Sequence, residues 1–185
     1  MNDSVVRLRA HVPGDIGWVI CKHGEIYSRE HGWDIRFESF VARIAADFVD
    51  HFDPAREICY MAVRGAGDLE QRIGCAFVVK QDDAVARLRM VLLVPEARGL
   101  GVGKRLVRAC IDFARDAGYE RMTLWTNDVL HAARAIYVAE GFSLIAEERH
   151  QSFGLDLVGQ NWERTLESVG TDGERVGSRR SRPRT

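Results

Sequence analysis

The glycine-rich segment "RGLGVGKRL" at residues 98–106 constrains the fold of this chain more than any other feature. It follows closely on an apolar run at 85–94, "VARLRMVLLV", which has the length and composition of a strand. After the glycines, apolar residues recur at three- and four-residue spacing, which predicts a helix over 101–117. Glycine tolerates positive φ and close approach of other groups to the backbone. The sequence therefore predicts a strand–turn–helix unit whose turn ends at a helix N-terminus.

Such a turn can bind an anion. The first N–H groups of a helix lack partners within the helix, and the helix dipole favours negative charge there. Lys104 and Arg105 add positive charge. A Walker A loop is excluded, because Gly99 and Gly103 enclose three residues instead of four and Arg105 has no hydroxyl for magnesium. A Rossmann fingerprint is excluded because its last glycine would be Lys104. Pyrophosphate binding without a metal remains; the alternative is a turn that only permits tight strand–helix packing.

The rest of the pattern predicts an α+β (mixed α/β) fold. Asp15 follows Pro13-Gly14 and is expected to cap the first helix. Three apolar runs between turn residues predict an antiparallel meander. The expected strands are 5–11, 58–64, 72–80, 85–94, 121–127, 142–150 and 157–167, and the expected helices are 15–29, 37–48, 101–117 and 131–141. Strands and helices in this order favour one mixed sheet over a repeated βαβ unit.

Length and charge limit the classes of function. A chain of 185 residues suggests one domain, here 1–168, and the glycine- and arginine-rich residues 169–185 are predicted to be a disordered basic tail. A net charge of −1 gives no overall signature for nucleic acid or membrane. No apolar run or signal core is long enough for a membrane span or secretion, so we expect a cytoplasmic protein. The four cysteines are scattered, which favours reduced, mostly buried thiols and no metal site.

The loop "RGLGVG" at 98–103 resembles the Arg/Gln-x-x-Gly-x-Gly/Ala signature of the GNAT superfamily of N-acetyltransferases. The following helix, the strand "MTLWT" and the segment "ARAIYVAEGF" resemble that family in the same order, and the resemblance spans roughly residues 5 to 168. The segments "EHGWDIRFESFVARIAADF", "LWTNDVLHAARAIY" and "FGLDLVGQNWE" resemble most the acetyltransferase domains fused to winged-helix regulators of the multiple-antibiotic-resistance type. This sequence shows no winged-helix half, so the resemblance implies no DNA binding.

The resemblance implies a twisted, mostly antiparallel sheet of about seven strands, splayed between the fourth and fifth strands and flanked by about four helices. Acetyl-CoA would lie in that opening as cosubstrate, without a metal. The backbone of the fourth strand would bind the pantetheine arm and the thioester carbonyl, and could stabilise the oxyanion of acyl transfer. The implied cofactor-binding residues are Val91, Leu92, Leu93, Arg98, Gly99, Leu100, Gly101, Val102, Gly103, Lys104 and Asn127. Many relatives carry an asparagine where this chain has Leu130, and Asn127 is the nearest substitute.

Tyr137 in "ARAIYVAEGF" matches the family tyrosine that protonates the departing thiolate, and the alternative is a core tyrosine with a satisfied hydroxyl. The general base stays open among Glu30, Glu38, His31 and His150. We take Glu30 as the first candidate, because the end of the first helix borders the acceptor pocket in this family.

These observations predict an N-acetyltransferase that moves an acetyl group from acetyl-CoA to a primary amine by direct attack in a ternary complex. The acceptor is expected to be a small molecule or a peptide. An acyl-CoA-binding sensor with little turnover is the alternative. A nucleic-acid-binding module ranks below both, because its only support is a tail with five arginines in the last eleven residues. We expect no membrane and no nucleic-acid partner, and a homodimer is a family expectation.

Overall fold

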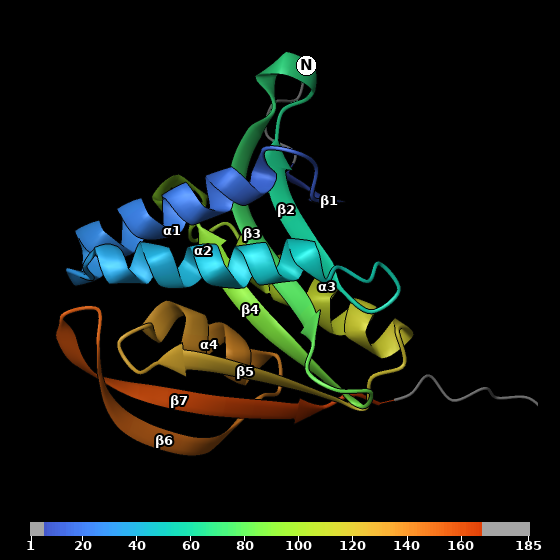
Figure 1. Ribbon diagram of the computed structural model, residues 1–185. Coiled ribbons are helices and arrows are strands. Elements are labelled where there is room, and N and C mark those ends of the chain that lie inside the picture. The colour runs from blue at the N-terminus through green and yellow to red at the C-terminus, as the bar shows by residue number, and fades with distance from the viewer. Residues whose placement is uncertain (1–5, 168–185) are drawn as a thin grey trace, which may run out of the picture.

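The computed structural model describes residues 6–167 and shows one seven-stranded sheet with four α-helices (Figure 1). The strands are β1 (Val6–Ala10), β2 (Ile58–Arg64), β3 (Gln71–Lys80), β4 (Val85–Leu93), β5 (Arg121–Asn127), β6 (Ser143–Ser152) and β7 (Leu155–Thr165). The helices are α1 (Asp15–His31), α2 (Ile35–Asp50), α3 (Val102–Asp116) and α4 (His131–Ala139). The strand order is β1-β2-β3-β4-β5-β7-β6. The predicted element order, strand number and fold class are confirmed.

The sheet parts between β4 and β5, the one parallel pair among neighbouring described strands. Their register runs only from Val85↔Arg121 to Leu88↔Leu124, although β4 continues to Leu93 and β5 to Asn127. On its other edge β4 stays paired with β3, with a register shift opposite Met90, whose φ is 52°. The predicted splay is confirmed, and it leaves the end of β4 with one edge that no described strand covers.

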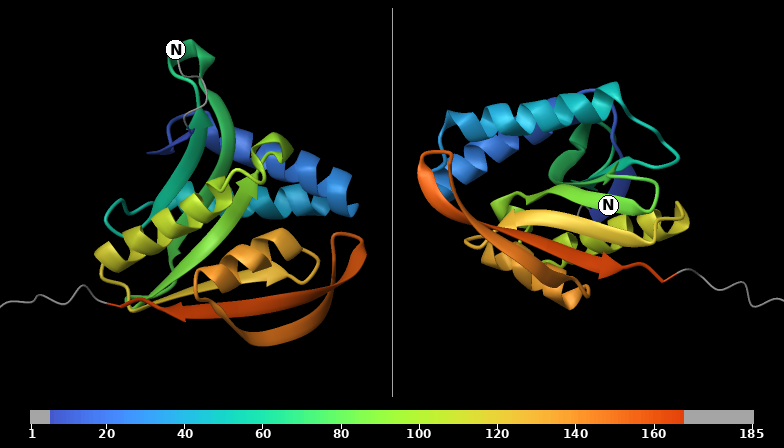
Figure 2. Two further views of the ribbon diagram at one scale, coloured as in Figure 1. Left: turned by 180° about the vertical axis from the view of Figure 1, so that it is seen from behind. Right: turned by 60° about the horizontal axis from the view of Figure 1, so that its bottom comes forward.

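Helices cover both faces of the sheet (Figure 2). α1 and α2 pack over β2 and β3 on one face, with Val19, Phe48 and Phe77 in that core. α3 and α4 pack on the other face, with Leu106 and Tyr137 in the larger core. In the view from behind, α3 crosses the sheet and α4 lies over β5 (Figure 2). The opening between β4 and β5 therefore has helices from both layers beside it.

The start of α1 differs from the prediction. Gly14, with φ 94°, is the N-cap residue, and Asp15 is the first helical residue and fully buried. Its carboxylate accepts hydrogen bonds from Arg9 Nη1 (2.6 Å), Arg72 Nε (2.5 Å) and the Val12 N–H (2.8 Å). Asp15 as a helix cap was wrong, because the positive φ of Gly14 turns the chain so that the carboxylate faces two strand arginines.

The β6–β7 hairpin curves toward the α1–α2 turn (Figure 1). At its tip Phe153 packs against Trp33, with ring centroids 5.1 Å apart, and its carbonyl accepts the Asp34 N–H at 3.1 Å. The hairpin therefore closes one end of the opening. In the part of the chain from 6 to 167, no helix has the length and hydropathy to cross a bilayer. The predicted tail 169–185 lies outside the described residues.

Candidate active site

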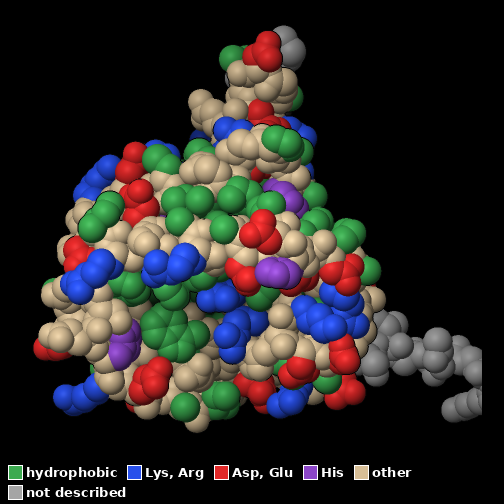
Figure 3. All heavy atoms as spheres, in the orientation of Figure 1, with side chains coloured by type: hydrophobic (Ala, Val, Ile, Leu, Met, Phe, Trp, Pro, Cys, Tyr) green, Lys and Arg blue, Asp and Glu red, His purple; other side chains and the backbone are tan. Residues whose placement is uncertain are grey.

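A cavity of about 490 Å³ lies where β4 and β5 part. Its walls come from α1, α2, α4, the β6–β7 hairpin, and the parts of β4 and β5 near and beyond the point where these two strands stop pairing with each other. Figure 3 shows hydrophobic and basic side chains side by side in the band between the two front helices and the lower strands. On one side an aromatic cluster of Tyr27, Trp33, Phe37 and Phe153 lines the cavity, with centroid separations between 4.6 and 5.1 Å. The cavity is suited to an organic molecule with an apolar body.

Tyr137 reaches this cavity from α4. The side chain is only 6% exposed, yet its hydroxyl makes no hydrogen bond with any residue in the described range 6–167. Burial raises the pKa of Tyr137 well above its usual value, so the hydroxyl keeps its proton at neutral pH. Tyr137 therefore brings a protonated hydroxyl to the cavity wall.

A polar group faces the cavity from the β5 and β6 side. Glu148, His150 and Ser152 alternate along β6 and all line the cavity. His150 Nε2 lies 2.9 Å from Asn127 Oδ1, and Nδ1 lies 2.9 Å from the Ser152 hydroxyl. Because Asn127 Oδ1 can only accept, Nε2 carries the proton and Nδ1 is the acceptor nitrogen. His150 thus holds one basic nitrogen in a fixed orientation at the cavity wall.

The other predicted bases lie elsewhere. Glu30 forms an ion pair with Arg98 Nη1 at 2.9 Å, and neither it nor Glu38 or His31 is among the cavity-lining residues. Of the four candidate bases named from the sequence, His150 is the one that lines the cavity. Asn127 is 1% exposed and its carbonyl oxygen is taken by His150, so it offers a cofactor only its NH₂ group.

The glycine loop sits at the far end of β4. Gly99 and Gly101 have φ of 75° and 73°, a region that side chains disfavour, and Gly101 is the N-cap of α3. Among residues 6–167 no side chain caps this helix, and no group accepts a hydrogen bond from the N–H groups of residues 99–104. The Lys104 ammonium lies 3.8 Å from Glu140, and the Arg98 guanidinium is partly exposed. The loop therefore combines N–H donors and positive charge, both of which suit an anion.

Gly103 has a packing role. A Cβ there would lie 2.9 Å from Ile136 Cδ1 and 3.2 Å from Leu93 Cδ1, so α3 could not approach α4 and β4 as closely. The glycines therefore differ in what they do structurally: Gly99 and Gly101 shape the turn, and Gly103 permits close packing. The same contact places the end of β4 at the α3 N-terminus, while Val91 lines the cavity.

The cysteines have no place in the site. Cys59, Cys75 and Cys110 are buried, as predicted, and Cys21 is exposed. Burial raises the pKa of the Cys75 and Cys110 thiols far above the usual value, so neither forms a thiolate readily. Neither residue lines the cavity. Among residues 6–167, no group of three His, Cys, Asp or Glu side chains is arranged as metal ligands.

Comparisons with known proteins agree with this geometry. The family model described as "Acetyltransferase (GNAT) family" matches residues 18–142. The chain is 27% identical over 145 residues to a mycothiol acetyltransferase of Arthrobacter sp. (strain FB24), and the aligned region covers 75% of this chain and 42% of the relative. It is 33% identical over 78 residues to human N-acetyltransferase 8B, which covers 40% of this chain and 34% of that protein. The chain thus spans less than half the length of these two curated relatives.

Solved structures share the fold. A phosphinothricin acetyltransferase of Sinorhizobium meliloti, in complex with acetyl-CoA, superposes with a TM-score of 0.70 at 22% identity, over 91% of this chain and 92% of that one. A spermidine N-acetyltransferase of Vibrio cholerae, in complex with CoA and spermine, gives 0.67 at 16% identity, over 87% and 95%. With the family model covering most of the described residues, the chain belongs to the acetyltransferase (GNAT) family.

Proposed function

We propose that this protein is an acetyl-CoA-dependent N-acetyltransferase acting on a primary amine by direct attack in a ternary complex. The observation that carries the proposal is the parting of β4 from β5 beyond Leu88. It leaves one edge of β4 uncovered between the cavity at Val91 and the α3 N-terminus beside Leu93. One extended ligand can therefore lie along this edge with its anionic end on the loop and its reactive end near Tyr137.

The residues of the chain fit acetyl-CoA as the cosubstrate. The N–H groups from Gly99 to Lys104, with Arg98, are suited to the pyrophosphate, for which Arg98 exchanges its ion pair with Glu30 for the ligand. The uncovered backbone of Val91, Leu92 and Leu93 is suited to an amide-containing arm, because its N–H and C=O groups on that edge have no strand partner. A backbone N–H there would also stabilise negative charge on the thioester oxygen.

The transfer forms one bond and breaks another. The amine nitrogen attacks the thioester carbonyl carbon, the nitrogen–carbon bond forms, and the carbon–sulfur bond breaks. The Tyr137 hydroxyl gives its proton to the departing sulfur. The amine nitrogen loses a proton to His150 Nδ1, either directly or through Ser152, whose hydroxyl lies 2.9 Å from Nδ1. His150 then releases this proton to solvent, and solvent returns one to the Tyr137 oxygen, so both side chains regain their starting states. Asn127 holds the imidazole in this tautomer.

Calorimetric titration with acetyl-CoA, followed by thiol-release assays with a panel of primary amines, tests the proposal. We expect one site per chain and turnover with at least one amine. Gly101→Ala places a side chain at positive φ in the loop and should weaken acetyl-CoA binding about tenfold. Gly67→Ala is the matched control, because Gly67 also has positive φ, 57°, but lies in the β2–β3 turn. Absence of acetyl-CoA binding by the folded protein would refute the proposal.

Tight acetyl-CoA binding without turnover on any amine would instead support the alternative, an acyl-CoA sensor. A cytoplasmic location, a homodimer and a link to the acetyltransferase domains of multiple-antibiotic-resistance-type regulators stay predictions from the sequence. Salt-dependent DNA binding that is lost on removal of residues 169–185 would support the third hypothesis, a nucleic-acid-binding module.

A further inference from the structure

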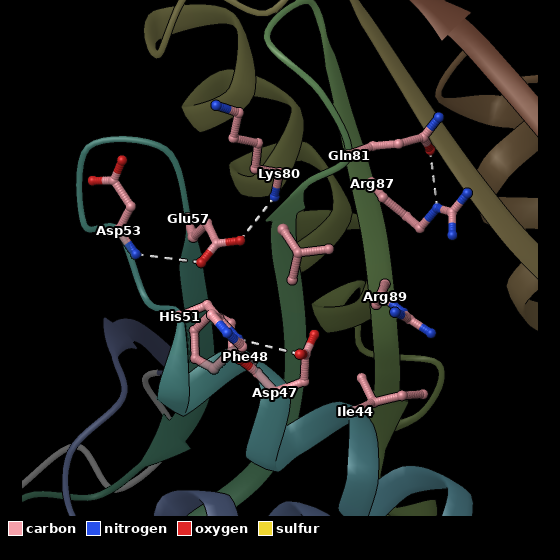
Figure 4. Close-up of a pocket in the computed structure, with 11 residues that line it drawn as sticks. Ile44, Asp47, Phe48, His51, Asp53, Glu57, Lys80, Gln81, Arg87 and Arg89 are labelled. Carbon is pink, nitrogen blue, oxygen red and sulfur yellow. Dashed lines mark hydrogen bonds and ion pairs between the residues drawn. The ribbon is translucent and has the colours of Figure 1, made fainter.

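Two arginines on β4 lie between the cavity and a second pocket. Arg87 and Arg89 are two residues apart on the strand and so point to the same face, toward α2. The second pocket, of about 510 Å³, lies between the end of α2 and strands β3 and β4 (Figure 4). Ile44, Arg87 and Arg89 line both hollows, so the two adjoin along these side chains.

The other charged groups of the second pocket are paired within the protein. The Asp47 carboxylate lies 3.2 Å from His51 Nδ1. Glu57 accepts backbone N–H bonds from Lys80 and Asp53, at 2.9 and 3.3 Å (Figure 4). Lys80 also forms an ion pair at its ammonium group, with Asp83 at 2.6 Å. Asp47, Glu57 and Lys80 therefore each have a partner within the protein.

Arg89 is different. Its side chain is half-buried, yet it makes no hydrogen bond or ion pair with any residue from 6 to 167, and Figure 4 draws none. Its neighbour Arg87 donates from Nε to Gln81 Oε1 at 3.1 Å and keeps the rest of its guanidinium free of described partners. Burial lowers the pKa of Arg89, the positive charge of Arg87 lowers it further, and Asp47 opposes this only in part. Two guanidinium groups so placed would be stabilised by an anion between them and the cavity.

We propose that the acceptor amine carries a carboxylate, and that Arg89, assisted by Arg87, binds this group and selects such acceptors. The inference rests on the proposed transferase function and names its substrate class. A guanidinium presents two parallel N–H groups that match the two oxygens of a carboxylate. Along β4, Arg89 is two residues and Arg87 four residues from Val91, and all three line the cavity. The carboxylate would therefore lie a few bonds from the reacting nitrogen, as in an amino acid, with an apolar side chain against the aromatic cluster.

The test compares each acid with its own neutral amide. The probes are L-phenylalanine, β-alanine and γ-aminobutyrate, which separate the two groups increasingly, each with its carboxamide, plus aminomethylphosphonate. Thiol release should show at least one acid preferred over its amide by about tenfold or more in kcat/KM, mainly through KM. Arg89→Gln should remove most of that preference and Arg89→Lys should restore part of it. Arg43→Gln is the matched control, because Arg43 lies on the exposed side of α2 and, among residues 6–167, donates a side-chain hydrogen bond only to Ser39.

Several outcomes would overturn the inference. Amides as good as their acids would do so, and so would Asp47→Asn abolishing the acid preference as Arg89→Gln does, because Arg89 would then serve to pair Asp47. A preference for the phosphonate alone would mean that Arg89 binds a phosphorus acid and not a carboxylate. Calorimetry of the acids with CoA-loaded protein separates the two proposals. If acids bind selectively through Arg89 but no amine is acetylated, the transferase function is refuted and the carboxylate site stands. If amines are acetylated without preference for acids, only the carboxylate site is refuted.

Discussion

Replacing Tyr137 by phenylalanine removes only the hydroxyl that we assign as the proton donor. The ring would keep its packing, which includes an edge-to-face contact with Phe142 at 6.0 Å between centroids. The hydroxyl makes no hydrogen bond within residues 6–167. Its loss should therefore change the free energy of unfolding by less than about 1 kcal/mol.

The expected effect on catalysis is large by comparison. General acid catalysis contributes about one-hundred- to ten-thousand-fold, which corresponds to about 3–5 kcal/mol of activation free energy. The raised pKa of Tyr137 means that the phenol is protonated across the working pH range. The loss in kcat should therefore be nearly constant from pH 6 to pH 9, with acetyl-CoA affinity almost unchanged.

Thiol release at saturating acetyl-CoA, calorimetry and chemical denaturation together measure the three quantities. Tyr60→Phe is a suitable control, because Tyr60 is half-buried on β2 and does not line the cavity. A variant at Tyr137 that kept kcat within about threefold of the parent would show that the sulfur takes its proton from water. A loss confined to acetyl-CoA affinity would show that Tyr137 binds and does not protonate.

Four further substitutions test other parts of the structure. Gly159→Ala should destabilise the protein by about 1–3 kcal/mol, because its Cβ would lie 2.8 Å from the Trp125 ring. Gly17→Ala in α1 should stabilise it by about 0.5–1 kcal/mol, because no atom of residues 6–167 would lie within 4 Å of the added Cβ. The folded-state pKa of Asp15, about 2 against an ordinary 3.8, should contribute about 2 kcal/mol above pH 5 that is lost as the pH falls toward 2, and Asp15→Asn should remove this slope in urea denaturation. His150→Gln should lower kcat by about one-hundred-fold, which thiol release at saturating acetyl-CoA measures.

Each of these has a result that would contradict it. Equal stabilities for the two alanine variants would show that the Trp125 ring moves freely. An unchanged acid slope in Asp15→Asn would mean that other carboxylates control unfolding, despite the burial of Asp15 between Arg9 and Arg72. A His150→Gln variant with the parent's kcat would return the choice of base to Glu148 or to water.

Much of the fold was predictable because its signals are local. Each signal lies within a short stretch of sequence: the three glycines, the apolar stripe of α3, and the turn residues between β2, β3 and β4. All the predicted elements are present. Asp15 shows where such reading fails. A cap residue and a buried carboxylate look alike in sequence, and only the pairing of β1 with β2 and of β2 with β3 brings Arg9 and Arg72 to it.

The choice of base meets a related difficulty. Glu30 is the first candidate from the sequence because it lies at the end of a helix, and in the structure its side chain pairs with Arg98 on the glycine loop. The alternation of Glu148, His150 and Ser152 is visible in the sequence, yet it says only that they share a face of β6. Which face meets the cavity depends on β7 inserting between β5 and β6, and that order is not a local property.

The two halves of the site therefore differ in what a sequence can reveal. The half assigned to acetyl-CoA is built from backbone, namely the uncovered edge of β4 and the N–H groups after Gly99, so a short glycine motif is enough to report it. The acceptor half is built from side chains on β4, β6 and α4 that meet only after folding. Proteins with the same loop can then accept different amines without losing the cosubstrate. On this reasoning Arg89 and His150, which no motif marks, are the positions at which relatives of this chain should be compared to find those that share its acceptor.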